Sequence, residues 1–343
     1  MRDYTIFIPE YIAAGAAIGI IGVELFWPNF RKDALAYLTA LAAVVWFVAG
    51  LFFIGKDAQS FQGLIASDDF TTYFRLLAAG IVFVVSIISA NYMSERTKTA
   101  AEFYGLMLIG GCAMVYMAAA TELITAYISL ELLSFSLYIL VGYLKRDNLS
   151  SEASLKYILL GAFSSAMFLY GMSLVYGVTG TTTYEGIGAA LADRSADTDT
   201  AVITGFMLII AGVGFKVSAA PFHMWAPDAY EGAPLPITAF LSTLSKAAGF
   251  AMILRLFGTA IVVDAVEWRW AIMVLAAATM TLGNLVAIQQ KNLKRLVAYS
   301  SIGQVGYMLI SIAAIGYGDG AGGVNATSGL LIHIIGYVCS TLL

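Results

Sequence analysis

The segment GVGFKVSAAPFHMWAPDAYEGAPLPITAFLSTLSKAAGFAMILRL, residues 212–256, is the most informative part of the sequence. Two lysines, Lys216 and Lys246, lie in surroundings that are otherwise apolar or small, and four of the six prolines of the chain fall between them. A charge at membrane depth beside helix-breaking residues predicts an interrupted membrane helix, whose freed backbone groups face protein or water instead of lipid. An ordinary proline kink near the end of a span is the alternative.

Composition places the rest of the chain in the same environment. Of its 343 residues, 60% are hydrophobic and 12% are charged, and the mean hydropathy is +0.84. Soluble domains are about half apolar and about a quarter charged, so 18 basic and 22 acidic residues are too few to cover a soluble protein of this size. These values exclude a soluble enzyme, a disordered tail and a nucleic-acid-binding protein, and they indicate that lipid surrounds the chain.

Apolar windows of about 20 residues predict eleven transmembrane helices. They run roughly over residues 8–27, 34–55, 70–92, 102–119, 121–144, 153–177, 201–223, 236–258, 269–289, 295–317 and 327–343. Spans of this length use most of the chain and leave one sizeable loop, 178–200. We therefore expect an all-α polytopic membrane protein without a separate soluble domain.

Basic residues outside the apolar stretches fall unevenly on the two sides of the predicted membrane. One side carries ten of them: Arg31, Lys32, Arg96, Lys98, Lys145, Arg146, Lys156, Lys291, Lys294 and Arg295. The other side carries six: Arg2, Lys56, Arg75, Arg194, Arg255 and Arg269. Because cytoplasmic loops carry an excess of Lys and Arg, this distribution predicts an outward-facing N-terminus and a cytoplasmic loop at residues 291–295.

Three ionisable residues remain at membrane depth: Lys216, Lys246 and Glu131, the last within AYISLELLSFSLY. A charge there costs at least about 2.5–3.5 kcal/mol on insertion scales, so each needs a partner or a wet cavity. The three are natural partners for one another. Structural ion pairs between helices are one interpretation, and a proton relay is the favoured one, because the charge of a buried lysine depends on nearby carboxylates. Movement of Glu131 towards or away from Lys216 would then load or unload a proton.

The two histidines and the hydroxyl residues carry weaker signals. His223, just beyond Pro221, is either a loop histidine or a group through which protons enter or leave, and His333 is more typical of packing than of a relay. Hydroxyls near the charged residues more often pack helices together than hold water. They are Ser134, Ser136, Ser242, Thr243 and Ser245.

Small residues and the remaining glutamates are interpreted structurally. Gly161 and Ser165 have the spacing of close helix packing. Glu10 and Glu24 mark the two ends of the first span, which indicates interfacial positions, with Glu24 also able to serve a neighbouring helix. Glu122 opens the fifth span and is expected near an interface.

No residues suited to a redox cofactor are evident in the sequence. Cys112 and Cys339 both fall in apolar stretches, which excludes a disulfide framework and a cysteine-held iron–sulfur or zinc site. The two histidines lie far apart on different segments, and no glycine motif follows a strand and opens a helix as in a dinucleotide site. We therefore expect no cofactor in this chain.

The segment quoted above resembles the signature region of the antiporter-like membrane subunits of respiratory complex I, the NADH-quinone oxidoreductase. Within this family, YEGAP followed by SKAAGF is more similar to subunit N, called subunit 2 in mitochondria, than to subunits L or M. Two other stretches agree, LELLSFSLYILVGY with SEASLKYILLGAFSSAMFLYG (130–171) and QKNLKRLVAYSSIGQVGYM (290–308). The resemblance runs from about the fourth span onward, and the first three spans fit only in hydropathy and position.

The resemblance implies a proton-translocating subunit of this enzyme in the bacterial cytoplasmic (inner) membrane, with subunits M, K and J as partners. It implies that Lys216 carries the proton, that Glu131 modulates it and that Lys246 passes it laterally. His223 and His333 remain further candidates for the relay from the residue pattern alone. NADH, FMN, iron–sulfur clusters and quinone would all bind to other subunits.

The resemblance also implies a division of the chain into three parts. Residues 1–100 form three N-terminal helices, 101–260 a complete five-helix repeat, and 261–343 part of its inverted partner. Family members usually have about fourteen spans, so we expect a truncated or split product, or a subunit whose exit half a neighbour supplies. Two other functions stay open: a subunit of a multisubunit cation/proton antiporter or membrane-bound hydrogenase, and a structural remnant that does not conduct.

Overall fold

The computed structural model of the chain describes residues 4–28, 30–97, 99–192, 200–259, 266–315 and 321–343. Within these ranges, eleven helices are long and apolar enough to span a membrane. They are α1 (Ile8–Phe26), α2 (Lys32–Leu51), α3 (Asp69–Arg96), α4 (Ala101–Ala119), α5 (Leu123–Val141), α6 (Asn148–Thr179), α8 (Thr200–Val217), α10 (Leu235–Thr259), α11 (Val266–Ile288), α12 (Leu293–Ala314) and α13 (Ala321–Leu342). Each predicted span corresponds to one of these helices, which confirms an all-α polytopic membrane protein.

Short elements connect the long helices, and the sequence did not predict them. They are the 3₁₀ turns η1 (Thr5–Phe7) and η2 (Phe61–Gly63), the strands β1 (Ala58–Ser60) and β2 (Ile65–Ser67), and the helices α7 (Tyr184–Ala192) and α9 (Trp225–Gly232). The strands form an antiparallel hairpin in which Ala58 pairs with Ser67. Helix α7 occupies part of the predicted loop 178–200, and residues 193–199 lie outside the described ranges.

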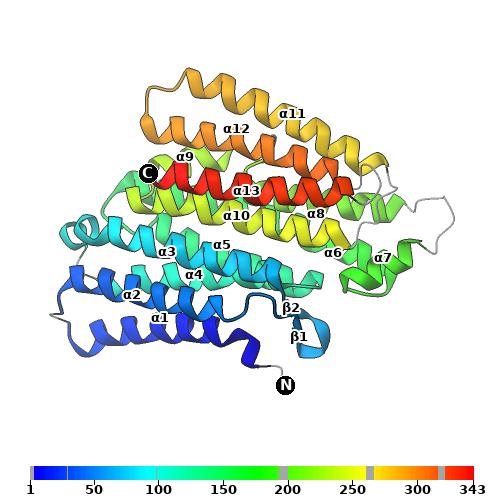
Figure 1. The fold of residues 1–343 in the computed structure, drawn as a ribbon. Coiled ribbons are helices and arrows are strands. Elements are labelled where there is room, and N and C mark those ends of the chain that lie inside the picture. The colour runs from blue at the N-terminus through cyan, green and yellow to red at the C-terminus, as the bar shows by residue number, and fades with distance from the viewer. Residues whose placement is uncertain (1–3, 29, 98, 193–199, 260–265, 316–320) are drawn as a thin grey trace.

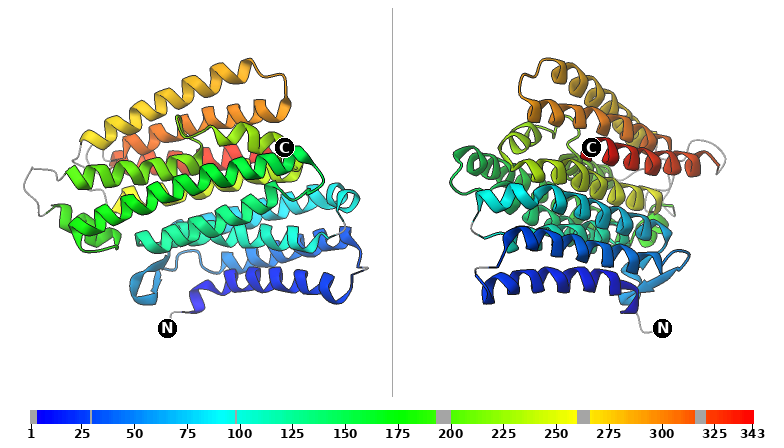
Figure 2. Two further views of the ribbon diagram at one scale, coloured as in Figure 1. Left: turned by 180° about the vertical axis from the view of Figure 1, so that it is seen from behind. Right: turned by 60° about the vertical axis from the view of Figure 1, so that its left-hand side comes forward.

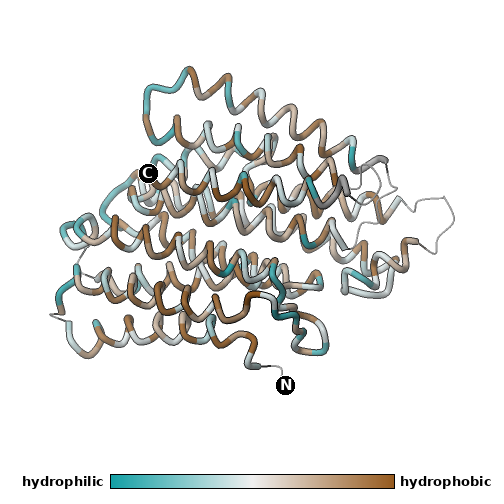
Figure 3. The backbone as a smooth tube through the Cα atoms, in the orientation of Figure 1, coloured by the Kyte–Doolittle hydropathy of each residue, from teal (hydrophilic) through white to brown (hydrophobic). Residues whose placement is uncertain are grey.

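The long helices lie side by side in a bundle. Helices α1 and α2 form one edge of it and α11 and α12 the opposite edge (Figures 1 and 2). Helix α10 lies inside, packed against α3, α4, α8 and α13, and nearly all of its side chains are buried. Hydrophobic residues dominate along the helices, while hydrophilic ones gather at the connections (Figure 3). The bundle therefore presents apolar flanks to lipid and keeps its polar residues for its ends and its interior.

Charged side chains tie α10 to the start of α3. Asp68 caps α3 by accepting a hydrogen bond from the N–H of Thr71 at 2.8 Å, and Arg255 Nη2 lies 2.8 Å from Asp68 Oδ1. Burial alone would raise the pKa of the Asp68 carboxyl, but Arg255 and the N–H of Thr71 together hold that pKa below its usual value. This contact fixes the C-terminal end of α10.

Glu10 and Arg75 form an ion pair inside the N-terminal part of the bundle. Their side chains are 1% and 0% exposed, and Arg75 donates to both carboxylate oxygens, at 2.6 Å from Nε and 3.2 Å from Nη2. Both residues lie near the starts of their helices, as predicted, but the pairing and the burial were not predicted. The arginine on α3 permits burial of the carboxylate on α1, since two paired charges satisfy each other where neither has water.

Glu24 and Glu122 both serve as helix caps. Glu24, on α1, accepts hydrogen bonds from the N–H groups of Ala100 and Ala101 at the start of α4, and so serves a neighbouring helix. Glu122 is the N-cap of α5 and accepts from the N–H of Thr125 at 2.9 Å. A carboxylate at a helix N-terminus satisfies free N–H groups and favours the helix dipole.

Candidate functional site

Helix α8 ends one residue after Lys216, and α9 begins only at Trp225. The predicted span 201–223 is therefore too long at its C-terminal end, where residues 218–224 leave the helical path. Ser218, the first of them, adopts the left-handed conformation with φ of +67°, which is uncommon for a residue with a side chain. The structure thus contains the predicted interruption rather than a proline kink in a continuous helix.

Side chains from three neighbouring helices satisfy backbone groups that the interruption frees. The hydrogen bonds run from Trp225 Nε1 to Phe215 O (2.8 Å), from Ser245 Oγ to Lys216 O (3.4 Å) and from Ala220 N to Thr279 Oγ1 (3.0 Å). In a membrane, an unpaired backbone group costs several kcal/mol, since no water replaces the lost partner. Helices α9, α10 and α11 therefore stabilise the break jointly.

Replacement of Thr279 by valine tests this account of the break. The substitution keeps the shape of the side chain but leaves the buried N–H of Ala220 without an acceptor, so we expect a loss of about 1–3 kcal/mol of stability. Thermal unfolding of the purified protein in detergent measures it. The control is Thr39→Val, since the buried Thr39 hydroxyl donates to Leu35 O of its own helix. Equal unfolding midpoints for the two variants would contradict the assignment.

Lys216 lies fully buried and bonds to a hydroxyl. Its Nζ donates to Ser134 Oγ on α5 at 2.9 Å, and Ser134 in turn donates to Leu130 O at 2.7 Å. Within the described part of the chain, Lys216 bonds to Ser134 and Glu131 bonds to Ser165, and the two charges form no ion pair with each other. Ser134, one turn along α5 from Glu131, is thus the bonded partner of Lys216.

Glu131 pairs instead with a hydroxyl of α6. Its Oε1 accepts a short hydrogen bond from Ser165, and the carboxylate stays partly exposed at the edge of the bundle. Gly161, one turn earlier on α6, packs closely as predicted, because the Tyr138 hydroxyl lies directly over it. Ser165, which was predicted to pack, thus contacts the acidic group of the site.

Lys246 is fully buried and contacts the break from the opposite side. Its Nζ donates to the Tyr230 hydroxyl on α9 at 2.7 Å and lies 3.4 Å from Ser218 Oγ. The same Nζ is 5.1 Å from the centre of the Tyr230 ring and 5.8 Å from that of Trp225. Hydroxyl oxygens and aromatic faces stabilise a cation without a full negative charge. Each lysine therefore has a hydroxyl partner that can bond it whether or not it holds its proton.

Hydroxyl, amide and imidazole groups extend from Lys246 towards α12 and α13. The Tyr230 hydroxyl is 3.3 Å from Ser301 Oγ on α12. One turn further along α12, Gln304 Oε1 is 3.0 Å from His333 Nε2 on α13. His333 thus makes a polar contact with α12 one turn from Ser301, and is not only packed against its neighbours.

His223 lies in the break but apart from this path. Its ring is half-buried, and its buried Nδ1 has no hydrogen-bond partner among the residues that the structure describes. The predicted candidates thus divide into two groups. Lys216 and Lys246 both lie at the break, whereas Glu131, His223 and His333 form no hydrogen bond with either lysine within the described residues.

The sequence did not single out several residues of the site, and the reason differs among them. Tyr230 is a tyrosine in a tyrosine-rich membrane protein, where this residue type usually marks an interface. Thr279, Ser301 and Gln304 lie on helices with no internal charge to attract attention. Ser134 was noticed, but a serine that bonds a lysine and one that bonds its own helix have the same sequence pattern.

The bundle and its site define a class of protein. A polytopic membrane protein that buries lysines beside an interrupted helix, and bonds them to hydroxyls, belongs with those that translocate ions or protons. The family described as NADH:quinone oxidoreductase/Mrp antiporter, TM, matches residues 120–343. With the relatives below, this shows that the chain belongs to the antiporter-like subunit N family of NADH-quinone oxidoreductase, respiratory complex I.

Relatives support this assignment over nearly the whole chain. The NADH-quinone oxidoreductase subunit N of Trichlorobacter lovleyi is 40% identical, with 98% of this chain and 67% of the relative covered. A chain of respiratory complex I from Thermus thermophilus is 31% identical with a TM-score of 0.78, covering 98% of this chain and 69% of that one. The chain thus spans about two thirds of the length of these relatives.

A chain of the Mrp complex of a Dietzia species shares the fold. It is 22% identical with a TM-score of 0.82, and the alignment covers 98% of this chain and 36% of that one. Identity at this level shows the fold alone. The alternatives of an antiporter subunit, a hydrogenase subunit or a non-conducting remnant are therefore not favoured over a subunit of NADH-quinone oxidoreductase.

Proposed function

We propose that this chain moves protons through the membrane part of an NADH-quinone oxidoreductase by a relay centred on its two buried lysines. Lys216 carries the proton, Glu131 modulates the affinity of Lys216 for it, and Lys246 passes it laterally towards α12 and α13. The observation that carries the proposal is that hydroxyls bond the two lysines, Ser134 for Lys216 and Tyr230 for Lys246, and that no carboxylate of the described residues does so.

Hydroxyl partners suit proton transfer better than carboxylate partners do. A lysine in a buried ion pair cannot lose its proton without leaving an uncompensated carboxylate, which is strongly unfavourable. A hydroxyl accepts a hydrogen bond from an ammonium group and donates one to a neutral amine, so it serves both states of the lysine. Ser134 and Tyr230 therefore support Lys216 and Lys246 with or without their protons.

Glu131 acts on Lys216 from a distance in this proposal. It lies one turn from Ser134 on α5 and bonds Ser165, so the carboxylate and the lysine flank the same hydroxyl-bearing turn. A displacement of α5 or α6 that moves the carboxylate towards Ser134 favours the charged lysine, and the opposite displacement favours the neutral one.

In this proposal His333 extends the relay, and His223 is a group through which protons enter or leave. The contact between His333 and Gln304 supports the first role, since amide and imidazole groups link α12 to α13 beyond Tyr230 and Ser301. For His223, the support is its unpartnered, buried Nδ1 beside the break.

The exposed face around Glu131 supports contact with partner subunits. Ile128, Leu132 and Phe135 on α5 are exposed there, and the partly exposed carboxylate lies among them. Lipid does not tolerate a carboxylate at membrane depth, so a protein surface covers this face in the proposal. The neighbours that we propose are the antiporter-like subunit M and the small subunits K and J.

The remaining parts of the proposal concern the host complex. NADH, FMN, iron–sulfur clusters and quinone bind to partner subunits, and this chain holds no cofactor. The membrane is the bacterial cytoplasmic (inner) membrane, with the N-terminus outward, because the side that carries the loop 291–295 has more basic residues. The chain divides into N-terminal helices (1–100), a first repeat (101–260) and part of a second (261–343).

Replacement of Lys246 by methionine tests the relay. Methionine fills similar volume but neither binds nor releases a proton, so we expect the protons translocated per NADH oxidised by the assembled complex to fall while electron transfer persists. Proton uptake into vesicles that contain the complex measures the ratio. The control Lys56→Met removes an exposed lysine. An unchanged ratio for Lys246→Met would refute the relay.

A further inference from the structure

Helix α9 is too short to hold its own position. It has eight residues, follows the break and ends at the turn into α10. Isolated helices shorter than about 12 residues are marginal even in favourable sequences, so its neighbours must fix it. The helix carries Trp225, which bonds the end of α8, and Tyr230, which bonds Lys246 at 2.7 Å. Where α9 lies therefore determines the environment of the second lysine.

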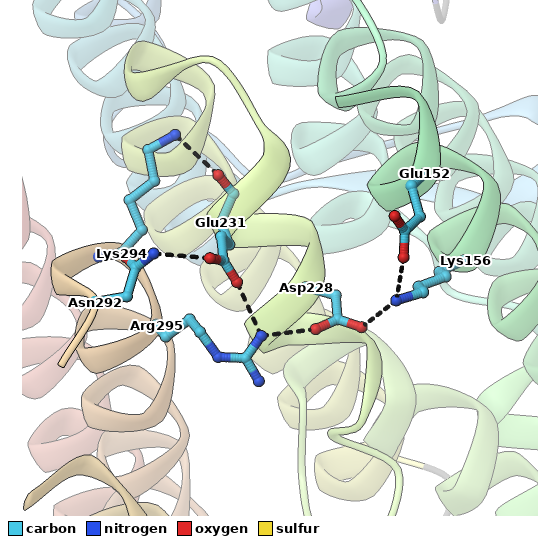
Figure 4. A network of polar contacts seen from close by, with 7 residues as sticks. All are labelled: Glu152, Lys156, Asp228, Glu231, Asn292, Lys294 and Arg295. Carbon is cyan, nitrogen blue, oxygen red and sulfur yellow. Dashed lines mark hydrogen bonds and ion pairs between the residues drawn. The ribbon is translucent and has the colours of Figure 1, made fainter. Parts of the chain in front are cut away.

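A network of charges joins α9 to α6 and α12 near one end of the bundle (Figure 4). Asp228 on α9 accepts hydrogen bonds from Lys156 of α6 at 2.9 Å and from Arg295 of α12 at 2.8 Å. Arg295 also lies 2.9 Å from Glu231, on the next turn of α9. Each carboxylate oxygen of Asp228 thus faces a different helix, which ties α9 to both.

The C-terminal end of α9 is tied to α12 as well. Lys294 Nζ donates to the carbonyls of Glu231 and Ala233, at 3.0 and 2.7 Å. Asn292, the N-cap of α12, donates to Glu231 Oε1 at 2.8 Å. A cation on the last carbonyls of a helix satisfies free acceptors and favours the helix dipole. The same end of α9 is therefore held through both its side chains and its backbone.

Packing against α6 complements these charges. The ring of Tyr157 stacks on that of Trp225, with centroids 4.3 Å apart. At Gly232 the backbone approaches α6 so closely that a Cβ there would lie 2.6 Å from Leu149 O. Because Lys156 and Tyr157 are adjacent on α6, the ion pair to Asp228 and the aromatic stack act on α9 at the same level.

We propose that Asp228 is a positioning residue of the relay. Its bonds to Lys156 and Arg295 hold α9, and therefore the Tyr230 hydroxyl, against Lys246. This inference rests on the proposed proton relay and adds to it a device outside the path itself. The Asp228 side chain is 32% exposed, so salt screens its ion pairs more than it screens contacts in the interior. Ionic strength therefore alters proton transfer through Lys246.

Asp228→Asn in the assembled complex tests the proposal. Loss of the charge weakens two charge-assisted hydrogen bonds, and we expect the rate of proton translocation relative to NADH oxidation to fall about fivefold. Raising the salt concentration should bring the unmodified complex towards the variant and leave the variant unchanged. Asp228→Glu keeps the charge and should restore most of the rate. The matched control is Asp33→Asn, whose carboxylate is 31% exposed and pairs with Arg31 away from α9.

Each result separates this inference from the relay. If Lys246→Met lowers the ratio of protons to NADH and Asp228→Asn does not, only the positioning role is wrong. If Lys246→Met has no effect, the relay itself is wrong. A role of Asp228 in stability alone would reduce the amount of complex without changing that ratio or its salt dependence. Should Asp228→Asn fail to assemble, a salt-independent ratio in the unmodified complex overturns the proposal.

Discussion

Lys216→Ala should slow proton transfer through this chain by about a hundredfold or more, the usual effect of removing a group that binds and releases the proton. Lys216 is buried, bonds to Ser134 Oγ at 2.9 Å and lies one residue before the end of α8. Alanine has no group that can extend to the Ser134 hydroxyl and exchange a proton there. The protons translocated per NADH oxidised, measured in vesicles that contain the assembled complex, should fall to the part that other subunits carry.

Lys216→Arg distinguishes proton exchange from the mere presence of charge. Arginine retains its proton under all physiological conditions, so the variant keeps a cation at the break but cannot pass a proton on. We expect it to fail as Lys216→Ala does. Lys56→Ala, a change at an exposed lysine, should behave like the unmodified chain. Full activity of Lys216→Arg would show that the lysine supplies only charge.

Glu10→Gln should cost about 3–5 kcal/mol of stability, the usual cost of breaking a buried ion pair on one side. The substitution leaves Arg75 fully buried with a charge that it cannot lose. Arg75→Met should cost less, since a carboxylate without its partner can take up a proton and become neutral. The thermal unfolding midpoint of the purified complex, together with the amount of chain in the membrane, shows which of the two variants is less stable.

The double variant Glu10→Met with Arg75→Met is the control for this pair. Apolar replacement of both partners of a buried ion pair is often neutral or stabilising, so the double variant should recover most of the stability that Glu10→Gln loses. Proton translocation should be unaffected in all three variants that assemble, because the pair lies between α1 and α3, away from the break. An equal loss for the single and double variants would show that shape, not charge, matters here.

Sequence reasoning located the spans because eleven apolar windows leave few alternatives in lipid. It located Lys216 and Lys246 for the same reason, since a charge in such a window is conspicuous. It failed for charged residues that are buried in the bundle although they lie near the end of a span. Glu10 and Arg75 lie near the ends of their helices and are nevertheless buried, because each finds the other across the bundle. Only the arrangement of α1 and α3 in the folded bundle contains that information.

The polar partners of the lysines were the least predictable part of the site. Ser134 and Tyr230 reach the lysines through the relative rotation of α5 and α9, which no periodicity specifies. The short helix α9 escaped prediction because its eight residues contain a proline and two acids, a pattern that indicates a loop. Its helical form depends on Lys294 and Arg295, more than sixty residues further along the chain.

The backbone partners of the break bear on the order in which the protein is made. The N–H of Ala220 bonds Thr279 Oγ1, 59 residues later in the chain. At about 5–20 residues per second of synthesis, that hydroxyl leaves the ribosome roughly 3–12 seconds after the residue that needs it. During this interval the N–H relies on water or on the insertion machinery. The interrupted helix thus reaches its final form only when α11 enters the membrane. The surroundings of Lys216 are therefore completed only after this later helix has been synthesised.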